Sequence, residues 1–272
     1  PGCPLPVKAE DMDQQKCDTQ CGQSHPWKLW DKNNQDFDYI HKMEQKRNSR
    51  VRRREVAAGM VINLTSFVYM ASVLFDFSFV SSYASVQEDL LYLSEHINNQ
   101  KISSIAWLFT SFATMVCIPF YLLVFHKKLH TLQYLNGLLI LGASLGFLLM
   151  GNAGLELHRL MTEIPAEDFR ETGEELRLRL LDQFRQEQLF RKIGSSFVGL
   201  FAIGLALSRI RLKRFPLFSA VLFLISGPLL IFYNWYDPDH LVRTAAMAGI
   251  MVGMVVFGVK LVNRGLSVPV PG

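Results

Sequence analysis

The sequence lacks the motifs by which several classes of enzyme are recognised. It contains no HExxH of zinc peptidases, no GxSxG of serine hydrolases and no glycine-rich loop that would hold a phosphate. No cluster of acidic residues suits metal-assisted chemistry. These absences favour a protein that is not an enzyme, and a membrane enzyme stays open as an alternative below.

Charge is scarce over long parts of the chain. The sequence is 50% hydrophobic and 19% charged, but six stretches are nearly free of charge: residues 57–83, 103–125, 132–155, 193–207, 216–235 and 241–262. A helix needs about 20 apolar residues to cross the hydrocarbon core, and its backbone groups must be satisfied within the segment. The fourth stretch is short and continues the helical pattern before it. These patterns predict an all-α fold, a polytopic membrane helix bundle with six transmembrane helices surrounded by the lipid bilayer.

Basic residues gather in alternate loops. Residues 44–55, 126–130 and 208–215 are strongly basic, whereas residues 85–102 carry more acidic than basic side chains. The positive-inside rule then places both termini on the cytoplasmic, matrix or stromal side. The predicted location is a bacterial inner membrane, or an organellar or plasma membrane. We expect no nucleic-acid partner, because the sequence has no separate basic domain.

Three regions follow from this pattern: a polar, basic N-terminal tail at 1–55, a transmembrane domain at 56–264 and a short C-terminal tail at 265–272. The tail includes an aromatic segment at 25–43, which we expect along the inner interface. Residues 156–192 form the predicted outer segment between the third and fourth spans. Its part at 166–192 is highly charged yet places Leu176, Leu180 and Phe184 at helical spacing, which predicts an amphipathic helix. This helix is either a cap over the bundle or a docking surface for a soluble partner or another subunit.

Cysteines and a histidine recur in the N-terminal tail. Cys17, Cys21 and His25 follow one another at every fourth residue, and Cys3 upstream completes a set suited to zinc. The paired CxxC of a zinc knuckle is absent, and Pro26 follows the histidine directly. Free or lipid-modified thiols and a disulfide are the alternatives to a zinc site.

Polar residues are rare inside the predicted spans, and they are the candidates for a proton or ion site: Asn63, Asp76, Asn152 and Asn234. Asp76 lies in the apolar run VLFDFSF. Two hypotheses explain it. The first is a structural pair with His158, Arg159 or Arg243, and the second is a proton relay.

Two further patterns lie within the spans. Gly249 and Gly253 form a GxxxG, which predicts close helix packing. His158 and His240 both lie at outer helix ends, where they could hold one haem between them.

Three hypotheses for function follow. The first is a non-catalytic subunit, scaffold or assembly factor of a larger membrane complex, with other membrane subunits as partners. The second is a small-molecule or proton carrier or channel that uses Asp76. The third is a membrane cytochrome or enzyme, which rests on the scattered histidines and cysteines.

Overall fold

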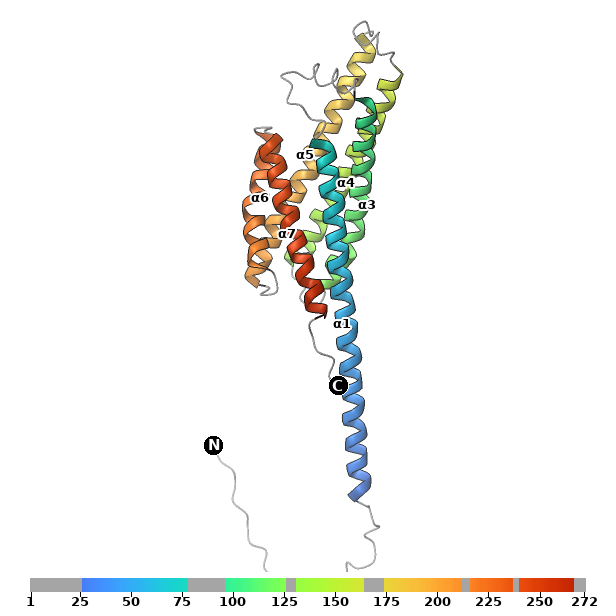
Figure 1. Cartoon of the computed structure of the whole chain (residues 1–272), viewed down its shortest axis with the longest axis vertical. Helices are drawn as coiled ribbons and strands as arrows, with labels where there is room; N and C mark the ends of the chain where they lie inside the picture. The colour runs from blue at the N-terminus through green and yellow to red at the C-terminus, as the bar shows by residue number, and fades with distance from the viewer. Residues whose placement is uncertain are drawn as a thin grey trace, which may run out of the picture. The chain divides into compact units, whose positions relative to one another are not determined.

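The computed structural model describes the backbone of residues 26–77, 96–125, 131–163, 174–211, 216–236 and 240–266. Within these ranges it describes the side chains of residues 49–75, 96–124, 131–163, 175–208, 216–236 and 241–266. All of the regular structure described is helical: α1 (Pro26–Phe77), α3 (Ile97–Phe125), α4 (Thr131–Thr162), α5 (Glu174–Arg211), α6 (Leu217–Trp235) and α7 (His240–Leu266) (Figure 1). The chain divides into two units, Pro1–Ser49 and Arg50–Gly272, and the packing described below belongs to the second.

The six helices are each long and apolar enough to cross a membrane, judged by length and composition. The candidate spans are Ser49–Phe75, Ile97–Val124, Thr131–Thr162, Glu175–Ser208, Leu217–Trp235 and Leu241–Leu266. The predicted all-α fold with six spans is confirmed at this level. The six apolar helices also indicate an integral membrane protein.

Two helices extend further than the apolar stretches that predict them. The expected boundary between residues 55 and 56 falls inside α1, which begins at Pro26. The short fourth stretch is part of α5, which begins in charged sequence at Glu174 and runs without interruption to Arg211. Hydropathy marks only the apolar part of a helix, whereas the backbone hydrogen bonds continue through charged residues.

The helices pack in a closed ring. Each of α3, α4, α5 and α6 packs against the next helix in the chain. The side chains of Thr65 and Ser72 on α1 donate hydrogen bonds to the carbonyl oxygens of Ala113 and Ala106 on α3. Gly59 of α1 lies against α7, so the first of these helices also contacts the last.

The main core lies inside the ring, and three aromatic rings meet in it. The ring of Tyr69 on α1 meets the rings of Trp107 on α3 and Phe147 on α4 edge-on, with centroids 5.5 and 5.4 Å away. A second, smaller core joins Leu157 and Met161 of α4 to Leu180 and Phe184 of α5. Large apolar side chains cover the outward faces of the helices, for example Phe112, which is 68% exposed. Such faces suit contact with lipid.

Candidate functional site

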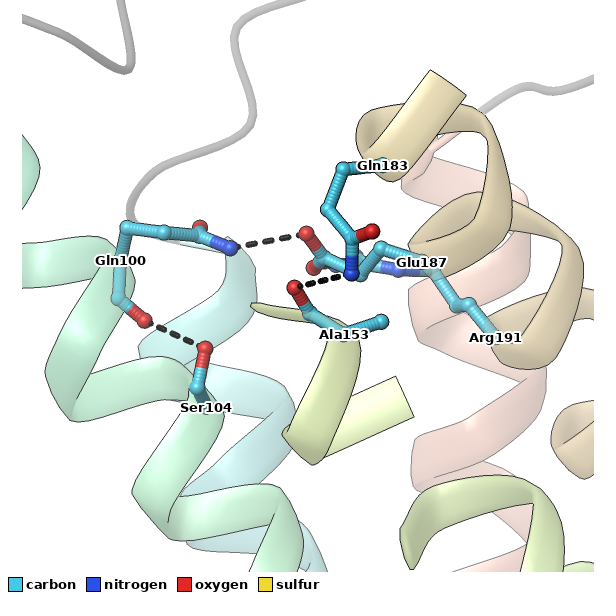
Figure 2. Close-up of polar contacts among 6 residues, drawn as sticks. All are labelled: Gln100, Ser104, Ala153, Gln183, Glu187 and Arg191. Carbon is cyan, nitrogen blue, oxygen red and sulfur yellow. Dashed lines mark hydrogen bonds and ion pairs between the residues drawn. The ribbon is translucent and has the colours of Figure 1, made fainter. Parts of the chain in front are cut away.

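A buried ion pair lies on α5 at one end of the bundle. The guanidinium Nη2 of Arg191 is 3.1 Å from Oε1 of Glu187, one helical turn earlier, and the two side chains are only 6% and 5% exposed. Gln100, in the first turn of α3, donates from Nε2 to Oε2 of Glu187 at 2.8 Å (Figure 2). We call this end of the bundle the Gln100 end. Both carboxylate oxygens therefore have a donor, which offsets part of the desolvation cost of a buried charge.

Two hydrogen bonds from side chains to the backbone lie around this pair, one between α5 and α4 and one within α3. Gln183 of α5 donates to the carbonyl oxygen of Ala153 on α4 at 3.1 Å, and Ser104 donates to the carbonyl oxygen of Gln100 at 2.8 Å (Figure 2). Gly154 of α4 packs directly against Ser104, where a larger residue would collide with the hydroxyl. We call Gln100, Ser104, Gln183, Glu187 and Arg191 the polar layer.

The polar layer lies level with the end of α6. Lys192, the residue after Arg191, places its ammonium 5.8 Å from the centre of the Trp235 ring. The indole Nε1 of Trp235, the last residue of α6, donates to Oγ of Ser196 at 2.8 Å. Tryptophan and lysine favour the boundary between lipid and water. The polar layer is thus at the height where α6 ends, and α5 continues beyond it.

A second group of buried polar side chains lies at the opposite end, where α4 begins. Asn136 of α4 donates from Nδ2 to the hydroxyl of Tyr121 on α3 at 3.2 Å and to Oγ of Ser208 on α5 at 3.5 Å. Gly204 of α5 leaves room for the Asn136 amide. Gln133, one turn earlier on α4, is also buried, and we call this end the Gln133 end. The amide of Asn136 thereby joins three helices.

A cavity of about 60 Å³ lies between these two groups, in the middle of the ring. Five helices supply its lining: Thr65, Ser66, Tyr69, Thr114, Cys117, Tyr121, Ile140, Ala143, Val198, Phe201, Ile250, Met251 and Met254. The exposed lining is almost entirely apolar. A cavity of this size would hold a water molecule, but a water needs two or more polar partners to stay there.

The structure does not bring the four predicted intramembrane polar residues together as one described site. Asn63 packs against Gly258 of α7, and its Oδ1 has no described hydrogen-bond partner. Asn234 of α6 is buried, and neither its Oδ1 nor its Nδ2 has a described partner. Asn152 is exposed on the outward face of α4. Asp76 belongs to the last turn of α1, but its side chain lies outside the described residues. Of its predicted partners, Arg159 pairs with Glu156 at 2.6 Å.

The predicted metal and haem ligands fall mostly outside the described side chains. This holds for Cys3, Cys17, Cys21 and His25 of the zinc hypothesis. Among the residues that are described, no group of three or more histidine, cysteine, aspartate or glutamate side chains is placed to hold a metal ion. His158 lies half-buried on α4, and His240 is the first residue of α7, with its side chain not described.

Gly249 and Gly253 accept side chains of α6. Gly249 lies against the hydroxyl of Ser226, and Gly253 lies against the ring of Phe223. The close backbone contacts of the bundle occur at other glycines. A methyl group on Gly146 of α4, for example, would come within 2.7 Å of the Cα of Gly194 on α5.

Sequence reasoning missed the polar layer and the Asn136 group. Glu187 and Arg191 fall in the predicted charged outer segment, although their spacing of four residues, directly before an apolar stretch, is a signal of pairing. Asn136 lies inside the third apolar stretch, so the rarity of polar residues within the spans, which singles out Asn63, also applies to Asn136. The sequence gives no sign that Gln100 is buried, because Gln100 lies before the apolar stretch 103–125 and its neighbours are polar.

These features define an integral membrane protein built as a closed ring of helices, with polar groups at both ends and a small apolar cavity between them. Comparison with models of protein families, with curated proteins and with solved structures found no match to this chain.

Proposed function

We propose that this chain is a non-catalytic scaffold subunit of a larger membrane complex, with a docking surface for a partner at the Gln100 end. The observation that carries the proposal is the second core. Leu157 and Met161 of α4 pack with Leu180 and Phe184 of α5 on the far side of the polar layer from the main core. We call residues 154–162 and 175–190 the α4–α5 extension.

The length of the extension supports exposure to water. Glu175 precedes Lys192 by 17 residues, which corresponds to about 25 Å of helix at 1.5 Å per residue. If Trp235 and Lys192 mark the boundary of the bilayer, the second core is outside the hydrocarbon. We place this end on the outer side and both termini on the cytoplasmic, matrix or stromal side, following the basic loops.

The surface of the extension combines charged and apolar side chains. Arg179 and Glu175 form an exposed ion pair at 2.8 Å, and Arg177, Asp182 and Arg185 are exposed beside it. Leu178, among them, is 60% exposed. A surface that mixes an exposed leucine with charged side chains suits a protein partner better than lipid, because lipid chains offer the charges no partner.

A site-specific cross-linking experiment tests this function. A photoreactive amino acid replaces either Leu178, on the extension, or Leu224, which is 50% exposed on α6 within its apolar span. After purification from its own membrane in mild detergent, position 178 is expected to yield one adduct of fixed mass with a second protein, and position 224 only lipid adducts. A monomeric mass for the intact preparation, with no protein adduct at 178, would contradict the scaffold function.

A small-molecule or proton carrier is the second candidate, favoured by the central cavity between two polar groups. Asp76 is its predicted relay. In proteoliposomes with equal incorporation, Asp76→Asn should then abolish a proton flux that the wild type supports, because the amide cannot cycle a proton. We favour the scaffold, and expect Asp76→Asn to lower stability while the parent complex stays active.

A further inference from the structure

Hydroxyl groups in the lining of the central cavity are engaged by the protein itself. Ser66 donates from Oγ to a backbone carbonyl oxygen of its own helix at 2.8 Å, and Thr65 donates to the carbonyl oxygen of Ala113 on α3 at 3.2 Å. The hydroxyl of Tyr121 accepts a hydrogen bond from Asn136 at 3.2 Å. These polar groups therefore have partners in the surrounding helices.

The surface that faces the cavity is apolar. All of the lining residues except Thr65 and Thr114 are buried, and almost all of the surface that they leave open to the cavity belongs to apolar atoms. A water molecule in such a space would lose the hydrogen bonds that it makes in bulk water, because it needs two or more polar partners to replace them. An apolar occupant loses nothing of this kind, and it supplies the dispersion contacts that the walls of an empty cavity lack.

The size of the cavity limits what fills it. Its volume is about 60 Å³. An apolar cavity of about 150 Å³ stays dry and takes up benzene or xenon, so the cavity in this chain is less than half of that size. A single xenon atom or a diatomic molecule fits the smaller space, whereas a benzene ring is too large for it.

We propose that the central cavity is a binding site for one small apolar molecule of the size of xenon or dioxygen. The ligand comes from the hydrocarbon of the bilayer around the bundle, where apolar molecules concentrate because transfer out of water is favourable. The site uses only the middle of the ring. It is therefore independent of the partner that we propose for the α4–α5 extension.

Methionine methyl groups of the full chain provide the test. Met251 and Met254 line the cavity, whereas Met60 and Met115 are 59% and 41% exposed on α1 and α3. The protein, labelled with ¹³C in its methionine methyl groups and held in detergent micelles, is followed by NMR under rising xenon pressure. The resonances of Met251 and Met254 should shift and reach a plateau. Those of Met60 and Met115 should shift only in proportion to pressure, because they meet xenon dissolved in the micelle.

Two variants change the cavity in opposite directions. Ala143→Leu places a larger side chain in the lining and should abolish the plateau at Met254. Met251→Ala enlarges the cavity, so that benzene should give a saturable shift at Met254 that it does not give in the wild type. Met115→Ala shortens an exposed methionine outside the lining and is the matched control. It should respond to both xenon and benzene as the wild type does.

Several results would overturn the proposal. One is a shift at Met251 and Met254 that stays proportional to pressure, as at Met60, and another is a plateau that survives in Ala143→Leu. Equal saturation by benzene in the wild type and in Met251→Ala would contradict the size limit, and a nuclear Overhauser effect between water and the Met254 methyl group would show a hydrated cavity instead. Thermal unfolding shows whether each variant is folded. If Ala143→Leu does not fold, the benzene comparison decides.

Discussion

Glu187 shows how a single carboxylate is accommodated among apolar helices. It accepts a hydrogen bond from Gln100 on one oxygen and pairs with Arg191 through the other. Removal of one partner from a buried pair leaves an uncompensated charge, whereas removal of both leaves none. The pair thus makes the stability of this end sensitive to single substitutions.

We expect Glu187→Ala to lower the free energy of unfolding by about 3 kcal/mol, because Arg191 then stays buried without its carboxylate. The double variant Glu187→Leu with Arg191→Leu should lose less. Unfolding in mixed micelles of increasing denaturing detergent measures both changes. Glu175→Ala, which breaks the exposed pair with Arg179, is the matched control and should change stability by less than about 1 kcal/mol. A double variant less stable than the single one would contradict this account.

At the scale of helices, glycine sets the distance between neighbours. Gly146 and Gly194 let the backbones of α4 and α5 approach, and Gly199 and Gly227 do the same for α5 and α6. A methyl group on Gly199 would meet the carbonyl oxygen of Gly227 at 2.8 Å, where no side-chain rotation relieves the contact. These helix pairs must move apart to accept any larger residue.

Gly146→Ala is therefore expected to lower the free energy of unfolding by about 1–3 kcal/mol, through displacement of α4 from α5. Gly137→Ala serves as the control on the same helix, since its methyl group would meet only Leu122 at 3.5 Å, an ordinary contact. That control should be neutral or slightly stabilising, because alanine favours helix more than glycine does. Equal destabilisation by the two variants in the same unfolding assay would show that close approach at Gly146 is not the cause.

At the scale of the whole membrane-embedded unit, two cores lie on either side of the polar layer. The main core occupies the ring, whereas the buried residues of the second core all come from α4 and α5, with Ile97 at the start of α3 packed against them. Because α5 takes part in both, one continuous helix links an apolar environment to the predicted aqueous one.

Spin labels at Leu178 and Leu224 test where the bilayer ends. Both side chains are well exposed, so a label at either position reports on its surroundings. A label at 178 should be more accessible to a water-soluble nickel complex, and a label at 224 to oxygen dissolved in the hydrocarbon. Equal preference for oxygen at the two positions would place the α4–α5 extension inside the membrane.

The sequence sufficed to locate the six spans, because hydropathy over about 20 residues is a local property. It did not suffice to find which polar groups meet. Gln100 and Glu187 are 87 residues apart, and only the packing of α3 on α4 and of α4 on α5 brings them together. Asp76 is recognisable in the sequence because its neighbours are apolar. Glu187 has charged neighbours, so its sequence alone predicts an exposed position. Whether a charged residue is buried depends on the helix that packs against it, and the local sequence does not say which helix that is.

The ring closes through a contact between its first and last spans, and this imposes an order during biosynthesis. Spans enter the membrane as the ribosome makes them, so α1 is inserted long before α7 exists. Until then, the face of α1 that carries Gly59 and Asn63 has no α7 to cover it, and the Asn63 amide remains turned toward lipid or a helper protein. A nascent chain arrested before α7 would therefore be an open arc of helices, which an insertase or membrane chaperone would have to protect until the sixth span arrives.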